Sequence, residues 1–208
     1  MKTVLCFGDS LTWGSCPQTG GRHGHADRWP VALGETLVGV EIIAEGLRGR
    51  STVYDRPTAP ADMNGGRILP VLLHSHAPVD LVVIMLGIND LCEGWDVSHV
   101  RDGLMRLVEI VRHHPWRLPE TDVPDILLVS PPPMTPCWDA DVTAQKVSRS
   151  EALAAAIAPL AEAMDVGFFD AASVARASTA DGYHLEAADS RALGLALRNV
   201  VAGRLGLS

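Results

Sequence analysis

The 208-residue sequence lacks a long hydrophobic run, an excess of basic residues and a leader-like N-terminus. No apolar segment approaches the roughly 20 residues that span a membrane. The short apolar run near Met1 is followed at once by Asp9, unlike a signal peptide. With 17 basic and 25 acidic residues, the net charge is -8. We therefore expect no nucleic-acid partner and no membrane anchor, because both require clustered lysine and arginine.

The sequence also lacks paired-cysteine and metal-ligand motifs. Its four cysteines, at 6, 16, 92 and 137, show no CxxC spacing. This pattern is typical of reduced thiols, so we expect a cytoplasmic protein. There is no HExxH and no Cys/His ligand set, so we expect no metal and no cofactor. Six histidines are interpreted as surface or loop residues: His23, His25, His74, His76, His113 and His114.

The sequence does contain an alternation of apolar strand-like and helix-like segments. Hydrophobic residues make up 47% of the chain, enough for the core of a single domain over residues 1–208. Strands are predicted at 3–7, 40–44, 80–86, 125–130 and 166–169, most of them buried on both faces. Helices are predicted within 27–38, 66–76, 97–114, 145–164 and 186–205. The alternation predicts a doubly wound α/β fold with about five parallel strands.

Polar residues follow four of the predicted strands: directly after the first three and, after the fifth, just before the last predicted helix. They form the segments Gly8-Asp9-Ser10-Leu11, Glu45-Gly46-Leu47-Arg48-Gly49-Arg50, Gly87-Ile88-Asn89-Asp90 and Asp181-Gly182-Tyr183-His184. In a parallel sheet the carboxyl ends of the strands share one edge, where ligands bind. The sequence therefore predicts that these four segments meet.

Together these residues supply the parts of a serine hydrolase. A serine hydroxyl needs an adjacent base, and His184 is placed to accept the proton of Ser10. Asp181 can hold the second ring nitrogen. The expected oxyanion donors are the backbone N–H groups of Ser10 and Gly49 and the side-chain amide of Asn89. The alternative for Ser10 alone is an ordinary turn serine.

The chain resembles the SGNH, or GDSL, hydrolase family in its blocks GDSL, GIND and DGYH. Gly49 is assigned from EGLRGR, where Gly46 competes for the same role. The resemblance implies a three-layer, flavodoxin-like fold with a five-stranded parallel sheet flanked by helices. It also assigns Ser10, Asp181 and His184 as the triad.

The segments CFGDSLTWG, EGLRGRST, NGGRILP and DLVVIMLGIND are similar to those of the small bacterial arylesterases and acyltransferases of that family. Members cleave short-chain and aryl esters, some transfer the acyl group to alcohols or hydrogen peroxide, and they are homo-oligomers. We therefore expect a small-molecule ester as substrate and a homo-oligomeric protein.

Several neighbouring residues receive secondary roles. Leu11, Trp13 and Ser15 are expected to contact substrate, and Ser15 stands where a relative has a bulky aromatic residue. Asp9 and Asp90 are interpreted as structural residues that cap or join loops.

Two irregular stretches are predicted outside the strands and helices. Residues 48–66 are interpreted as a lid, a subunit contact or both. Residues 131–144, which open with three prolines, are interpreted as a rigid loop in preference to a polyproline ligand.

Two alternatives remain open. A carbohydrate acetylesterase or a thioesterase would use the same triad. A flavodoxin-like module could instead bind phosphate at the turn after the first strand, although the chain has no GxGxxG or P-loop motif.

Overall fold

Five parallel strands in the order β2-β1-β3-β4-β5 form the centre of the fold in the computed structural model, which describes residues 1–117 and 122–207. The strands are β1 (Lys2–Gly8), β2 (Val40–Gly46), β3 (Leu81–Met85), β4 (Asp125–Ser130) and β5 (Gly167–Asp170). Their number, their parallel direction and their positions in the chain confirm the predicted fold class.

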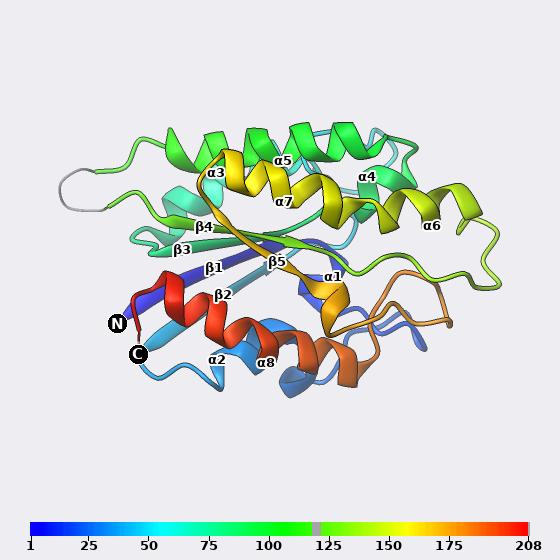
Figure 1. The fold of residues 1–208 in the computed structure, drawn as a ribbon, viewed down its shortest axis with the longest axis horizontal. Coiled ribbons are helices and arrows are strands. Elements are labelled where there is room, and N and C mark those ends of the chain that lie inside the picture. Colours follow the sequence, from blue (N-terminus) through cyan, green and yellow to red (C-terminus); the bar gives the residue numbers. More distant parts are fainter. Residues whose placement is uncertain (118–121, 208) are drawn as a thin grey trace.

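Helices cover both faces of the sheet, giving three layers (Figure 1). The α-helices are α1 (Ser10–Trp13), α2 (Trp29–Gly34), α3 (Gly65–His76), α4 (Ile88–Cys92), α5 (Val97–Arg112), α6 (Ala144–Glu151), α7 (Leu153–Ala163) and α8 (Ala187–Arg204). Two short 3-10 helices cover His25–Asp27 and Ala171–Ser173. Among the described residues, no helix is both long enough and apolar enough to cross a membrane.

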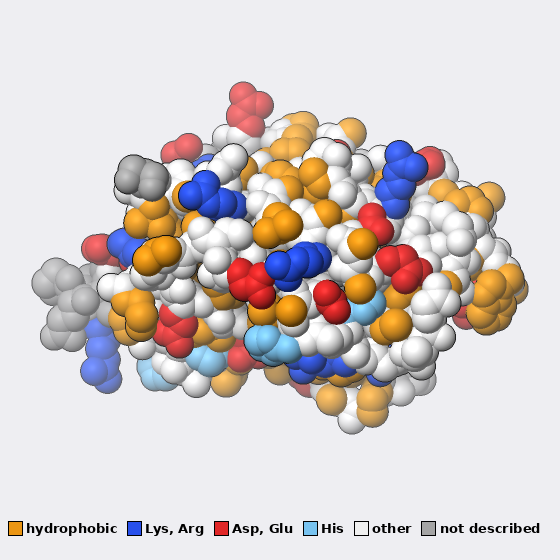
Figure 2. Space-filling model, turned by 90° about the horizontal axis from the view of Figure 1, so that it is seen from below, with side chains coloured by type: hydrophobic (Ala, Val, Ile, Leu, Met, Phe, Trp, Pro, Cys, Tyr) orange, Lys and Arg blue, Asp and Glu red, His pale blue; other side chains and the backbone are white. Residues whose placement is uncertain are grey.

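The sheet separates two hydrophobic cores, because successive strand side chains point to opposite faces. Leu5, Phe7, Val82 and Ile84 pack with α3, α5 and α7. Val4, Cys6, Val83 and Met85 pack with α2 and α8. On the α2 and α8 side, basic, acidic and hydrophobic side chains are interspersed on the outer surface (Figure 2).

The order in which successive strands are added to the sheet reverses at β1. The chain leaves β1 for β2 on one side and then returns to β3 on the other side. Gly8, the last residue of β1, pairs with Gly46 of β2 and Met85 of β3. Segments that follow these strands diverge around the end of β1, where a doubly wound sheet opens a crevice for ligands.

The structure corrects some predicted details. The two edge strands, β2 and β5, are only partly buried, because each has a neighbour on one side alone. The predicted helix 145–164 is two helices that meet at Ala152. The predicted helix 27–38 narrows to α2, which begins at Trp29 with Pro30 in its first turn and ends at Gly34.

Candidate active site

Ser10 is the first residue of α1 and lies directly after the carboxyl end of β1. The preceding Asp9 is the N-cap, and its Oδ1 accepts the backbone N–H of Leu11 at 2.9 Å. Asp9 is 1% exposed, and burial raises its pKa to about 6 in spite of that hydrogen bond. The predicted structural role of Asp9 is therefore confirmed, and the cap fixes where Ser10 stands.

Three side chains form a hydrogen-bonded series that starts at Ser10. The hydroxyl Oγ of Ser10 lies 2.9 Å from Nε2 of His184, and Nδ1 of His184 lies 2.7 Å from Oδ2 of Asp181. The other carboxylate oxygen of Asp181 accepts the backbone N–H groups of Tyr183 and His184, each at 3.0 Å. Burial opposes ionisation of Asp181, but these hydrogen bonds outweigh it and lower its pKa. Asp181 is thus held as a carboxylate beside the imidazole.

The loop that carries Asp181 and His184 is bonded to two other segments and is braced by a bond of its own. The backbone oxygen of Gly182 accepts the N–H of Thr135, and Nε2 of His23 hydrogen-bonds the backbone oxygen of Leu185 at 2.9 Å. Within the loop, Ser178 donates its N–H to the backbone oxygen of His184 at 2.7 Å. Gly182 has a φ of +82°, and a Cβ there would lie 2.8 Å from the oxygen of Thr135. A glycine is needed for this close approach.

The two glycines that compete for the oxyanion role have different surroundings. Gly46 ends β2, and a Cβ on it would lie 2.1 Å from the backbone nitrogen of Trp13, so Gly46 serves the packing of α1. Gly49 has a φ of +84° and lines the same cavity as Ser10 and His184. Within residues 1–117 and 122–207, neither the N–H of Gly49 nor that of Ser10 has a hydrogen-bond acceptor. Both donors are therefore free to meet a ligand oxygen.

Asn89 also lines the cavity, but its amide is already engaged. Its Nδ2 donates to Oδ2 of Asp9 and to the backbone oxygen of Arg50, both at 3.1 Å. Both amide hydrogens are thus used, and a ligand oxygen would have to replace the oxygen of Arg50. Asp9 orients the amide from one side, a contact that the sequence pattern did not predict.

Asp90, next to Asn89 on α4, holds the loop that follows β2. Its carboxylate accepts the backbone N–H of Thr52 at 3.1 Å and the hydroxyl of Thr52 at 2.6 Å. Asp90 is buried, and burial raises its pKa to about 6. These bonds confirm the predicted joining role of Asp90.

The buried Arg50 was not singled out in the sequence. Its guanidinium donates to the backbone oxygens of Gly8 and Glu45 and stacks over Phe7, with 4.1 Å to the ring centroid. Burial lowers the pKa of Arg50 to about 10. Arg50 thereby joins the ends of β1 and β2 beneath the site.

A cavity of about 670 Å³ opens over Ser10 and His184. The irregular stretch predicted at 48–66 supplies most of its wall, through Gly49, Arg56, Thr58, Ala59, Pro60, Ala61 and Met63. Arg56 fixes this wall, because it pairs with Glu93 at 2.6 Å and donates to the oxygen of Gly49 at 2.8 Å. The stretch is therefore part of the candidate substrate pocket.

The structure does not bring all three predicted substrate contacts to that cavity. Leu11 is 5% exposed and packs in the core beneath α2 and α8, because the short helix α1 turns it inward. Ser15 is 3% exposed and lies behind α1, with its N–H donated to the oxygen of Ser10. Neither Leu11 nor Ser15 lines this cavity. Trp13 is partly exposed and stands beside Arg48, which lines the cavity.

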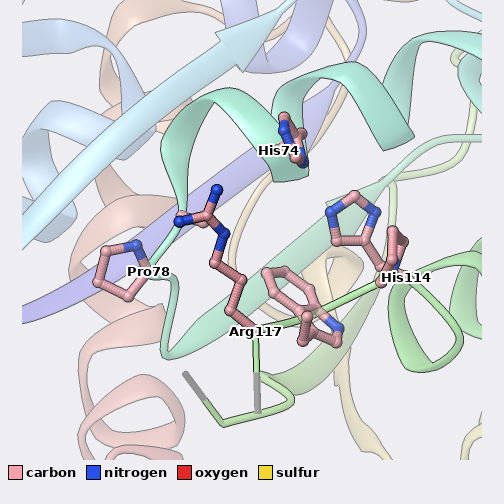
Figure 3. Close-up of a pocket in the computed structure, with 7 residues that line it drawn as sticks. His74, Pro78, His114 and Arg117 are labelled. Atoms are coloured by element: carbon pink, nitrogen blue, oxygen red, sulfur yellow. The ribbon is translucent and has the colours of Figure 1, made fainter. Parts of the chain in front are cut away.

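His23 lies in a loop, in line with the prediction, but its side chain is buried and its ring hydrogen-bonds the backbone oxygen of Leu185. His74 and His114 lie at the amino end of the sheet around a cavity of about 320 Å³, together with Pro78 and Arg117 (Figure 3). Their ring centroids are 5.9 Å apart. In the described part of the chain, no group of three or more His, Cys, Asp or Glu side chains is arranged to hold a metal ion.

A serine, a histidine and an aspartate hydrogen-bonded in series at the carboxyl edge of a parallel sheet define a serine-hydrolase type of site. Residues 6–192 match the model of the GDSL-like lipase/acylhydrolase family. The chain belongs to that family and is a carboxylic ester hydrolase.

Solved structures support the same assignment. A carbohydrate acetylesterase family member from Sinorhizobium meliloti has 46% identity and a TM-score of 0.96, with 100% of both chains covered. The aryl esterase of M. smegmatis has 36% identity and a TM-score of 0.90, covering 98% of this chain and 99% of that one. A second carbohydrate acetylesterase from S. meliloti has 35% identity and a TM-score of 0.91, with the same coverage. Among curated proteins, a search by sequence finds no match.

Proposed function

We propose that the chain is a serine esterase that hydrolyses short-chain acyl and aryl esters through an acyl-Ser10 intermediate. The observation that carries the proposal is the hydrogen-bonded series from Ser10 through His184 to Asp181, at 2.9 and 2.7 Å. It opens into a cavity beside the free N–H groups of Ser10 and Gly49.

The reaction uses each group in turn. Ser10 Oγ attacks the ester carbonyl while His184 Nε2 takes its proton, and Asp181 stabilises the resulting imidazolium. The N–H groups of Ser10 and Gly49 bind the oxyanion, and the Asn89 amide joins them by exchanging the oxygen of Arg50 for it. His184 returns the proton to the leaving alcohol or phenol. Water, activated by His184, then releases the acid and restores Ser10.

Short acyl groups are proposed because two of the similar structures are described as carbohydrate acetylesterases, whose acyl group is acetate. The stretch from Arg56 to Met63 encloses about 670 Å³ over the serine, and the ion pair of Arg56 with Glu93 fixes it. Transfer of the acyl group to an alcohol or to hydrogen peroxide requires that the acceptor compete with water in this cavity. We propose such transfer as a secondary activity.

A carbohydrate acetylesterase is the second candidate. Two of the similar structures are described as carbohydrate acetylesterases, one of them at 46% identity. The triad and the oxyanion donors would serve a sugar acetate in the same way, because the reacting atoms are identical. The two candidate functions differ in the alcohol part of the substrate, which is a simple alcohol or phenol in the first and a sugar in the second.

The test measures kcat and KM for 4-nitrophenyl acetate and 4-nitrophenyl octanoate, with acetylated xylose as the sugar substrate. We expect acetate to be preferred and the variant S10A to lose about 10³-fold or more in kcat. Equal, slow rates for wild type and S10A would refute the role of Ser10. A strong preference for the sugar acetate would favour the second candidate.

We further propose that the protein is a cytoplasmic homo-oligomer. Its four cysteines are free thiols. Trp138 is 82% exposed and its Nε1 donates to the oxygen of Ala180, so a large apolar side chain is held at the surface, where a second subunit could cover it. Light scattering after size exclusion tests the oligomer, and cell fractionation tests the location. A monomeric mass would refute the first proposal.

A further inference from the structure

The rim of the candidate active site carries arginines that have no carboxylate partner. Arg48 lines the cavity together with Ser10 and His184, and its guanidinium carbon lies 5.2 Å from the centroid of the Trp13 ring. The guanidinium carbon of Arg22 lies 4.8 Å from the same ring. Two positive groups thus contact one indole next to the cavity.

Arg22 and the nearby Arg28 are held by backbone contacts. Nε of Arg22 donates to the backbone oxygen of Trp13 at 2.7 Å, and Nε of Arg28 donates to that of His23 at 3.1 Å. Each bond holds a guanidinium without neutralising it. Across residues 1–117 and 122–207, no carboxylate lies within 4.0 Å of a nitrogen of Arg22, Arg28 or Arg48.

The contrast with Arg56 is informative, because Arg56 lines the same cavity but is paired with Glu93 at 2.6 Å. The chain as a whole has a net charge of -8, so carboxylates are abundant. Leaving like charges unpaired at one place costs free energy through mutual repulsion. Burial and the nearby charge of Arg28 both lower the pKa of Arg22.

We propose, on the basis of the proposed esterase function, that Arg48 and Arg22 with Trp13 form a subsite for an ester that carries a carboxylate near its scissile bond. A guanidinium binds a carboxylate through two parallel hydrogen bonds. The contacts with the Trp13 ring hold the guanidinium groups of Arg48 and Arg22 in place. A bound carboxylate would supply the acidic partner that Arg48 and Arg22 lack among the described residues. The substrate class is therefore an acyl ester of an acidic alcohol or phenol.

The experiment compares charged and neutral esters of the same shape. The probes are 3- and 4-acetoxybenzoate and the methyl esters of both, and the quantity is the ratio of kcat/KM for each acid to that for its methyl ester. Intrinsic reactivity cancels when this ratio is compared between variants. We expect R48Q and R22Q each to lower it about fivefold for at least one isomer. R48K keeps the charge and should retain most of the ratio.

The matched control is R101Q on α5, where Arg101 pairs with Asp102 at 2.7 Å on the surface. It removes one positive charge from the chain and should leave the ratio unchanged. Raising NaCl from about 0.05 to 0.5 M should lower the ratio in the wild type, because salt screens exposed charges. This salt series also decides the matter if R48Q fails to fold.

A ratio that stays within about twofold in R48Q and R22Q, and that salt does not change, would overturn the subsite. If the wild type cleaves neither the acids nor their methyl esters, the esterase function itself fails, and that result is distinct from the first.

Discussion

The buried ring of His23 hydrogen-bonds the backbone oxygen of Leu185, the residue directly after His184, at 2.9 Å. The two residues are 162 positions apart in sequence. This bond joins the segment that follows α1 to the loop that carries His184 and Asp181. His23 therefore acts as a positioning residue for His184.

Replacing His23 tests this bond. We expect H23A to lower the free energy of unfolding by about 1–2 kcal/mol, because the oxygen of Leu185 loses a buried donor. Less precise placement of His184 should also lower kcat for 4-nitrophenyl acetate about tenfold. H23Q retains a donor of similar reach and should keep most of both. Urea unfolding and steady-state kinetics measure these effects, and equal behaviour of H23A and wild type would contradict the role.

Asp181 should be needed as a carboxylate, since its lowered pKa keeps it ionised. In D181N the side-chain amide would donate to Nδ1 of His184, so the imidazole proton would move to Nε2. His184 could then no longer accept the proton of Ser10, and we expect kcat to fall about 10³- to 10⁴-fold. The matched control D102N removes a surface carboxylate and should leave kcat unaltered. A D181N enzyme within about tenfold of wild type would exclude Asp181 as the partner of His184.

Substitution by alanine should have opposite effects on the free energy of unfolding at Gly46 and at Gly203. In G46A the new Cβ would lie 2.1 Å from the backbone nitrogen of Trp13, so α1 must move. We expect a loss of about 2–3 kcal/mol in the free energy of unfolding and a lower kcat, because α1 carries Ser10. In G203A, on α8, no atom lies within 4 Å of the new Cβ, and the free energy of unfolding should rise by about 0.5 kcal/mol. Thermal unfolding of both variants measures the contrast.

Asp90 predicts a pH dependence of stability. Its pKa is about 6 in the fold against an ordinary value of 3.8, so protonation favours the folded state. Its stabilising contribution is complete below pH 3.8 and is lost as the pH rises through 6. Between about pH 5 and pH 7.5, the wild type should lose about 1 kcal/mol of unfolding free energy relative to D90N.

Urea unfolding at the two pH values gives this difference directly. Asparagine also weakens the bonds to Thr52, so D90N should be less stable at every pH, and only the pH-dependent part is diagnostic. The control D102N should follow the wild type. Parallel pH profiles of wild type and D90N would show that burial does not raise the pKa of Asp90.

The sequence predicted the elements that follow simple periodicity. Most strands were found because β-branched and apolar residues run without interruption, although Glu41 interrupts the run in β2. Ser10, Asn89 and His184 were found because each lies in a recognisable block, GDSL, GIND or DGYH. The short helix α1 was not predicted, because four residues carry no helical period. For that reason the burial of the Leu11 side chain in the core was not predicted, although leucine is an apolar residue.

Contacts between distant loops were beyond the sequence as well. Nothing local distinguishes His23 from the exposed His25, and only tertiary packing buries the first. The bond from Asn89 to Asp9 joins residues 80 positions apart. The choice between Gly46 and Gly49 depended on which of the two packs against the backbone of α1. The sequence alone does not give that contact.

The residues of the candidate active site are not all attached to the sheet equally firmly. Ser10, Gly49 and Asn89 follow β1, β2 and β3, which are neighbours joined by continuous ladders of hydrogen bonds. Asp181 and His184 lie in a loop beyond the edge strand β5 and depend on a few bonds to Thr135 and His23. Mild heat or denaturant should therefore detach the base from an intact nucleophile and oxyanion site. Inactivation would then precede melting of the sheet, and cooling would restore activity without refolding of the core.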